Sequence, residues 1–426
     1  MSVRNGLFAY FTAALLLVTG GCARQARPAA GTLDEADRLF ASAQFEEARG
    51  RYLAIAADDP RHFRARLRLG EIALLQNRNP EAERWLLEAA AIDGSSDEPS
   101  RLLAEAYYRS RAFDKSARYL RRFGAEATAS KLTYLSSRSP YQIDGPPTVR
   151  VKLVATDPLP LIAARVNGSA PVNFLIDTGA SEVILDRDFA REVGATEFGA
   201  SLGTFAADQK AEVIQAAVDS IVIGECRVSS VPVHLLPTRR FSGLYQDKRV
   251  DGVIGTRFLY LFAATVDYPN GELELSQPHG ADLPKGESAE IDVPVWLAGD
   301  HYLVAEGAVN GRAMLFFVDT GLAGLSFAAP ASTLEIAGIA ARPEDRLGGL
   351  GGGGAVTALR FSVDELALGG AVAHQAQGVA GVFPPSLENK FGFRIGGLIS
   401  HAFFRPYAVT FDFTRMLLRL REPATD

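Results

Sequence analysis

Residues 174–179 read Phe-Leu-Ile-Asp-Thr-Gly, and residues 316–321 read Phe-Phe-Val-Asp-Thr-Gly. In each stretch, three apolar residues lead directly into an aspartate, a threonine and a glycine. The apolar run predicts a buried strand, so the aspartate leaves the end of that strand in a poorly solvated position. The glycine lets the chain turn sharply and approach another backbone closely. Each stretch therefore predicts a carboxyl group held on a tight turn.

The two stretches belong to an internal duplication. Asp177 and Asp319 are 142 residues apart, and similar segments precede and follow both of them. Three segments recur in the same order: one before the aspartate, the Asp-Thr-Gly itself, and one near the end of each half. This recurrence predicts two similar halves, which we place at residues 148–285 and 286–426. The paired landmarks are Ala-Arg-Val-Asn-Gly (164–168) with Ala-Val-Asn-Gly (308–311), and Thr-Val-Asp-Tyr (265–268) with Thr-Phe-Asp-Phe (410–413).

The chemistry of such a duplication follows if the halves pair about a pseudo-twofold axis. Asp177 and Asp319 then meet at that axis, and two like charges about 3 Å apart cannot both ionise, so the pair holds one proton. Such a pair supplies a base and an acid together. The ionised carboxyl can activate a water, and the protonated carboxyl can polarise a carbonyl. This hydrolysis needs neither a metal nor another cofactor, and we expect none.

Asp-Thr-Gly-Ala-Ser at 177–181 resembles the signature of aspartic peptidases. The resemblance covers roughly residues 150–420 and includes a downstream hydrophobic-hydrophobic-glycine element in each half, at 251–255 and 397–400. Ala180 is closer to the retroviral type of half than to the pepsin type. The resemblance implies an all-β, bilobal aspartic-peptidase fold with two retropepsin-like lobes in one chain, and a β-hairpin flap from each lobe over the substrate.

The resemblance also implies roles for individual residues. Asp177 and Asp319 would be the catalytic dyad, and the flaps would lie at 203–213 and 348–357. The second half departs from the pattern because Leu322 and Ala323 follow its glycine, and because Ser400 replaces a glycine downstream. The residues that would form the active-site turns are Thr178, Gly179, Thr320 and Gly321.

Residues 33–123 repeat with a period of 34, and each unit reads as two amphipathic helices. Small and large residues recur at fixed positions, as in tetratricopeptide repeats, which this segment resembles. The resemblance implies an all-α array that docks the substrate or a partner protein; the alternative is a helical array without a partner. Residues 124–147 are rich in Ser, Thr, Arg and Pro. This composition predicts a linker, with no further helix to cap the end of the array. The matched positions are Ala36, Gly70 and Ala104; Ala48, Ala82 and Ser116; and Tyr52, Leu86 and Leu120.

Residues 1–22 read as an export signal. Arg4 precedes an apolar run at 7–18 that is too short to span a bilayer comfortably, and small residues lead into Cys22. This ending resembles a bacterial lipobox, although Thr19 stands where leucine is usual. The resemblance implies lipidation of Cys22 and a periplasmic protein anchored to the outer membrane by lipid alone.

Charge and composition bear on the partners. The net charge of −6 lacks the basic surplus of a nucleic-acid-binding protein, so we expect no nucleic-acid partner. The predicted activity is that of an aspartic-type endopeptidase acting on a polypeptide, as a monomer whose two lobes pair within the chain. Two alternatives stay open: a catalytically inactive binding lipoprotein on a peptidase fold, and a scaffold whose main function lies in the repeats.

Overall fold

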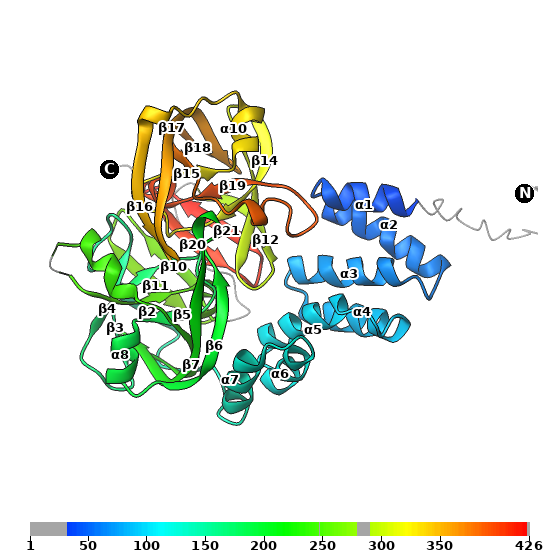
Figure 1. Cartoon of the computed structure of the whole chain (residues 1–426), viewed down its shortest axis with the longest axis horizontal. Helices are drawn as coiled ribbons and strands as arrows, with labels where there is room; N and C mark the ends of the chain where they lie inside the picture. The colour runs from blue at the N-terminus through cyan, green and yellow to red at the C-terminus, as the bar shows by residue number, and fades with distance from the viewer. Residues whose placement is uncertain (1–31, 247, 279–289, 424–426) are drawn as a thin grey trace, which may run out of the picture.

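The computed structural model describes residues 32–246, 248–278 and 290–423. It confirms the predicted fold class: a helical array comes first, and a mainly β region of two lobes follows. Figure 1 shows the array lying along one side of both lobes. The predicted export signal with Cys22 and the predicted lobe boundary at 285/286 lie outside the described residues. Across the part that is described, no helix has the length and apolar character needed to cross a membrane.

The helical array is a stack of paired helices whose spacing depends on small residues. A Cβ atom on Gly70 would lie 2.6 Å from the Leu86 side chain, so only glycine allows the second pair to close this tightly. Thr32 begins the array as an N-cap by accepting a hydrogen bond from the backbone of Glu35. The helices are α1 (Leu33–Ala41), α2 (Phe45–Asp58), α3 (Phe63–Leu75), α4 (Asn79–Ile92), α5 (Glu98–Arg109), α6 (Phe113–Arg122) and α7 (Glu126–Ser136).

The expectation of a linker without a capping helix was wrong for part of residues 124–147. Helix α7 occupies Glu126–Ser136, buries Ala129, Leu132 and Leu135, and packs on α6 and on three strands of lobe 1. The helix also carries Ala127 and Tyr134, and Glu, Ser, Thr and Lys fill the remaining positions. That composition concealed the helix because its burial comes from tertiary packing and not from strong local amphipathicity.

The array and the β region share an interface made by α1, α2, α3, α5 and α7. Phe45 of α2 packs edge-on against Trp296 and Phe393 of lobe 2, each with ring centroids 5.1 Å apart. On α5, the buried Arg109 donates to the backbone oxygens of Leu297 and Gly299 in lobe 2. The surface that the repeats turn inward is therefore occupied by the chain's own β region.

The lobes are joined by a six-stranded sheet to which each lobe gives three strands, in the order β12-β21-β20-β10-β11-β2. Strands β10 and β20 pair antiparallel at its centre, where the hydroxyls of Thr265 and Thr410 lie 2.7 Å apart. These residues occupy equivalent positions in the two halves, so the pseudo-twofold axis passes between them. This sheet extends into the strands of lobe 2, and a separate sheet with the order β1-β8-β5-β9-β4-β3-β7-β6 forms the rest of lobe 1.

The strands of lobe 1 are β1 (Gln142–Asp144), β2 (Thr148–Lys152), β3 (Leu161–Val166), β4 (Val172–Ile176), β5 (Val183–Leu185), β6 (Thr196–Thr204), β7 (Lys210–Ile223), β8 (Cys226–Leu235), β9 (Val250–Ile254), β10 (Ala263–Asp267) and β11 (Glu272–Ser276). Those of lobe 2 are β12 (Glu290–Ala298), β13 (Tyr302–Val309), β14 (Arg312–Val318), β15 (Phe327–Ala329), β16 (Arg346–Gly351), β17 (Gly354–Leu368), β18 (Ala371–Ala380), β19 (Ile395–Ile399), β20 (Ala408–Asp412) and β21 (Leu417–Arg421). The short helices are α8 (Arg187–Glu192), α9 (Thr256–Leu259), α10 (Ala331–Ala337) and α11 (His401–Phe404).

A Phe45→Ala substitution tests the interface between the array and lobe 2. Phe45 is 2% exposed, and removing a buried phenyl ring lowers the free energy of unfolding by about 3–5 kcal/mol. Denaturant unfolding, followed by tryptophan fluorescence, measures the change. Leu87→Ala on α4 is the control, because Leu87 is 42% exposed and should change stability by about 0.5 kcal/mol or less. Equal effects of the two substitutions would contradict the interface.

Candidate active site

Each lobe delivers its aspartate at the end of a buried strand. Strand β4 runs parallel to β9, and β14 runs parallel to β19. At the ends of these pairs, Asp177 N donates to Ile254 O and Asp319 N donates to Ile399 O, both at 3.0 Å. The predicted hydrophobic-hydrophobic-glycine elements are thus the strands that cross behind the two turns. We name residues 177–182 the first turn and residues 319–326 the second turn.

The two turns are bound to each other by reciprocal threonine hydrogen bonds. Thr178 Oγ1 donates to Val318 O at 2.9 Å and accepts from Thr320 N at 3.0 Å. In the same way, Thr320 Oγ1 donates to Ile176 O at 3.1 Å and accepts from Thr178 N at 3.0 Å. Both threonines are at most 1% exposed, so the four bonds lie in the protein interior, where each has a large effect on geometry.

The glycines of the two turns allow the carboxyls to come together. Gly179 N donates to Asp177 Oδ1, and Gly321 N donates to Asp319 Oδ1, both at 2.8 Å. A Cβ atom on Gly179 would lie 2.5 Å from Asp319 Oδ2, and one on Gly321 would overlap the Asp177 carboxyl. Each carboxyl therefore occupies the space that a side chain on the opposite turn would fill. Only glycine permits this reciprocal approach.

The environment of the pair favours a shared proton. Burial and the neighbouring Asp319 carboxyl raise the pKa of Asp177 well above its usual range. Burial also raises the pKa of Asp319. The two carboxyls are within hydrogen-bonding reach of each other, and a proton on one of them relieves the repulsion between like charges. The pair therefore titrates as one unit with two apparent pKa values.

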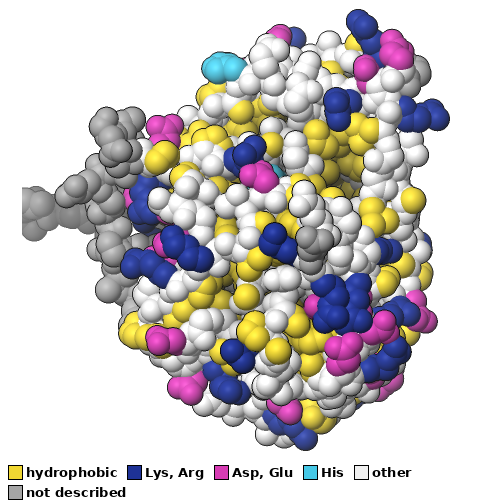
Figure 2. Space-filling model, turned by 90° about the vertical axis from the view of Figure 1, so that its left-hand side faces the viewer, with side chains coloured by type: hydrophobic (Ala, Val, Ile, Leu, Met, Phe, Trp, Pro, Cys, Tyr) yellow, Lys and Arg dark blue, Asp and Glu magenta, His cyan; other side chains and the backbone are white. Residues whose placement is uncertain are grey.

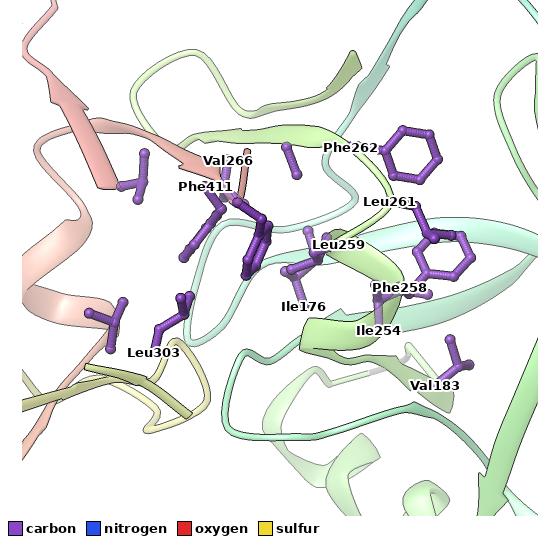
Figure 3. Close-up of a cluster of buried hydrophobic side chains, with 14 of the residues drawn as sticks. Ile176, Val183, Ile254, Phe258, Leu259, Leu261, Phe262, Val266, Leu303 and Phe411 are labelled. Carbon is purple, nitrogen blue, oxygen red and sulfur yellow. The ribbon is translucent and has the colours of Figure 1, made fainter. Parts of the chain in front are cut away.

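A cluster of buried hydrophobic side chains supports the first turn from behind (Figure 3). Ile176 precedes Asp177 in the chain, Ile254 ends the crossing strand, and both are fully buried. The cluster continues through α9 and reaches Leu303 and Phe411 of lobe 2. Close packing of this kind resists small displacements, so the turn is held rigidly against both lobes.

The second turn is longer than the first. Val183 and Phe327 occupy equivalent strand positions, and they lie six residues after Asp177 and eight residues after Asp319, respectively. The added length makes room for the side chain of Ser400, whose Oγ accepts from Leu322 N at 3.0 Å. The departures seen in the sequence of the second half therefore compensate each other locally.

Both predicted flaps are hairpins. Strands β6 and β7 form the first, with residues 205–209 at its tip, and β16 and β17 form the second, with its tip at 352–353. The tips meet: a Cβ on Gly352 would overlap the ring of Phe205, and Gln209 Nε2 donates to Ala355 O at 2.6 Å. Arg240 of lobe 1 also donates to Gly352 O. The tips of the two flaps, which come from opposite lobes, are thus in direct contact.

Two charged groups near the turns were not predicted. Glu182, the last residue of the first turn, pairs with Lys131 of α7 at 2.5 Å. Between the lobes, Asp157 of lobe 1 lies 3.1 Å from Nε2 of His401 and 3.0 Å from Nε of Arg405, both of lobe 2. Neither contact has a local sequence signal, because its partners are distant in the chain and no spacing rule connects them.

A Thr178→Ala substitution tests the bonds between the turns. It leaves the buried carbonyl of Val318 and the buried N–H of Thr320 without partners. Each unsatisfied group costs about 1–3 kcal/mol, so we expect the free energy of unfolding to fall by about 2–5 kcal/mol. Thr178→Ser keeps the hydroxyl and should lose about 1 kcal/mol. Urea unfolding compares the two variants, and an equal loss in both would show that the hydroxyl bonds contribute little.

Comparison with known proteins agrees with this geometry. A family model described as aspartyl protease matches residues 162–258 and 305–392, and a tetratricopeptide repeat model matches residues 33–97. A search of curated proteins found no match. Among solved structures, a retropepsin-like aspartic protease from Rickettsia conorii is similar at 17% identity and a TM-score of 0.21, over 32% of this chain and 94% of that chain. Both lobes of the β region, which follows tetratricopeptide-type repeats, thus match the aspartyl protease family model.

Proposed function

We propose that the protein is an aspartic-type endopeptidase with Asp177 and Asp319 as its catalytic pair. The observation that carries the proposal is the pair of Asp-Thr-Gly turns, joined by reciprocal threonine bonds at the pseudo-twofold axis. This arrangement holds two carboxyls at one point with one proton between them. The inactive alternative rests on Leu322 and Ser400, and the hydrogen bond from Leu322 N to the Ser400 hydroxyl gives Ser400 a local role in the second turn.

The proposed reaction uses the proton of the pair twice. The ionised carboxyl takes a proton from a water, and the water oxygen forms a bond to the carbonyl carbon of the substrate. The protonated carboxyl gives its proton to the carbonyl oxygen, so a gem-diol forms. The pair then gives a proton to the amide nitrogen and takes one from a hydroxyl of the gem-diol as the C–N bond breaks, which leaves a carboxylic acid, an amine and the pair with one proton again.

An extended polypeptide is the substrate that this site suits best. Strands β6 and β16 of the two flaps are the end strands of their sheets, so a substrate lying as a strand can pair with backbone groups there. Figure 2 shows the face of the β region that points away from the array, where hydrophobic side chains lie between interspersed acidic and basic ones. Such a mixed surface suits a polypeptide with varied side chains.

We also propose that the substrate or a partner protein docks on the repeats, at helices that the β region leaves uncovered. Since α1, α2, α3, α5 and α7 are in contact with the β region, a partner would use the outer helices α4 and α6. Leu87 on α4 is 42% exposed and is available there. The scaffold alternative would place the main function on this outer surface.

Asp177→Asn and Asp319→Asn test the proposed catalysis. Each variant lacks the acid–base pair, so we expect kcat for cleavage of an unfolded protein substrate to fall by at least about 1,000-fold. Mass spectrometry of the products measures cleavage between pH 3 and pH 8. Asp219→Asn is the matched control, because Asp219 is an exposed carboxyl on β7 of the same lobe, and its kcat should be unchanged.

The same variants give a stability readout with a definite sign. The folded state raises the pKa of Asp177, so it holds that proton more tightly than the unfolded chain does, and stability falls as the pH rises through the raised pKa. Asparagine has no such ionisation, so the free energy of unfolding of Asp177→Asn should exceed that of wild type at pH 8, with a smaller difference at pH 4. Wild-type protein that cleaves no polypeptide at any pH would favour the inactive alternative.

We also propose that the protein is exported and held at the outer membrane by a lipid on Cys22. A bacterial host that expresses the full chain should carry it in the membrane fraction. Cys22→Ser should move it to the soluble fraction of the envelope, because a Ser residue cannot receive a thioether-linked lipid. An unchanged distribution between the fractions, measured by immunoblot, would argue against the lipid anchor.

A further inference from the structure

The end of the first turn is packed directly against the backbone of β9 and α9. Thr256 N donates to Ala180 O at 2.9 Å. A Cβ atom on Gly255 would overlap the backbone oxygen of Glu182, so no side chain separates the two segments there. Because the first turn contains only residues 177–182, a displacement of Glu182 is carried back along a short segment to Asp177.

The side chain of Glu182 is buried, with 1% exposed, and it meets the helical array. Lys131 of α7 places its Nζ 2.5 Å from Glu182 Oε2, and Tyr108 of α5 donates its hydroxyl to Oε1 at 2.9 Å. Lobe 1 adds Arg257 Nη1 at 3.4 Å and His234 Nε2 at 3.3 Å. Lys131 is itself fully buried, so α7 carries a charged group through the interface to the first turn.

The charges of this group depend on one another. Burial raises the pKa of Glu182, but Lys131, His234 and Arg257 outweigh that effect and hold the pKa at about 2. Burial lowers the pKa of His234 to about 4, so its ring is neutral at neutral pH. Lys131 and Arg257 are then the cations that compensate the carboxylate. A buried carboxylate without enough compensation is strongly unfavourable, so without Lys131 the side chain has to move or take up a proton.

The second turn is braced in another way. Ser400 N donates to Ser326 O at 2.8 Å, at the position where Gly255 meets Glu182 in lobe 1. The Ser400 hydroxyl then accepts from Leu322 N within the same lobe. The first turn has glycine at the equivalent position and therefore lacks a hydroxyl of this kind. Lobe 1 instead supplies the hydroxyl of Thr256, which donates to Thr178 O at 2.8 Å, and the helical array contacts the outer end of the turn through Glu182.

We propose that Lys131 and Tyr108 are positioning residues that hold the first turn, and with it Asp177, through Glu182. This inference rests on the proposed peptidase function and deepens it. The array is then a part of the active-site scaffold in addition to any docking function. Figure 1 shows the arrangement that permits this, with α7 beside the strands of lobe 1 and α5 between α7 and lobe 2.

Lys131→Met in the full chain is the main test. A misplacement of about 1 Å can reduce a rate about 100-fold, so we expect kcat to fall by about 10- to 100-fold and KM to change by less than about threefold. The rate is counted per active site, titrated with a tight-binding peptide that carries a hydroxyl in place of the scissile carbonyl. Lys115→Met is the matched control, because Lys115 pairs with Glu83 at 3.6 Å on the array and is half-exposed.

Two further readouts separate positioning from a general loss of stability. The double variant Lys131→Met with Glu182→Gln removes both members of the ion pair and should regain most of the lost kcat. Hydrogen exchange, measured by mass spectrometry on peptides covering residues 177–183, should become faster in Lys131→Met and stay unchanged in Lys115→Met. The exchange readout requires no activity, so it tests the role of Lys131 even if the peptidase proposal fails.

The inference is overturned if Lys131→Met keeps its kcat per titrated site and its exchange rates within twofold of wild type. Should Lys131→Met fail to fold, Tyr108→Phe replaces it, since it removes one hydroxyl bond to Glu182 and keeps the ring. We expect its kcat to fall by about 3- to 10-fold, and an unchanged kcat would overturn the inference. If wild type is inactive but hydrogen exchange is still faster in Lys131→Met than in wild type, the peptidase proposal is refuted and the positioning role of Lys131 is kept.

Discussion

The structure of the β region depends on the bonds between two threonines and the strands that precede the opposite aspartates. Thr178 and Thr320 each donate to the partner strand and accept from the partner turn. These bonds fix the distance between two carboxyls that would otherwise repel each other. The folded chain tolerates that repulsion because the turns cannot separate without breaking four buried hydrogen bonds. Burial raises the pKa values of both carboxyls, and the neighbouring Asp319 carboxyl raises that of Asp177 further.

The two lobes satisfy the same constraint with different supports. In lobe 2, a longer turn and the Ser400 hydroxyl brace the second turn from within the lobe. In lobe 1, the shorter turn ends at Glu182, and helices α5 and α7 supply two of the partners of its buried carboxylate, beside Arg257 and His234 of the lobe itself. A duplicated fold can thus keep a symmetric centre while its two halves depend on different parts of the chain. The array and the β region then form one structural unit across a packed, charged interface.

Much of the centre was predictable from sequence because its signals are local or repeated. The apolar runs before Asp177 and Asp319 predicted buried strands, and the 34-residue period predicted paired helices. These features follow from patterns that a few neighbouring residues determine. Both flap hairpins were also predicted at their observed places, from the resemblance to aspartic peptidases.

The features that escaped prediction depend on contacts between distant residues. Helix α7 has a polar composition, and it forms because Ala129, Leu132 and Leu135 pack on lobe 1 and α6. The partners of Glu182 come from two helices, a strand and α9, so no spacing connects them. The compensation between Leu322 and Ser400 was likewise invisible, since each looked like an isolated departure until the longer turn brought them together.

The central claim is that two carboxyls share one proton at the axis between the lobes. Carbon-13 NMR of aspartate carboxyls, with Asp177 and Asp319 assigned by substitution, tests it most directly. The account predicts that both signals respond to the same two titration steps, with one step above the usual aspartate pKa of about 3.9. Two independent titrations near that ordinary value would contradict the shared proton, and with it the proposed catalysis.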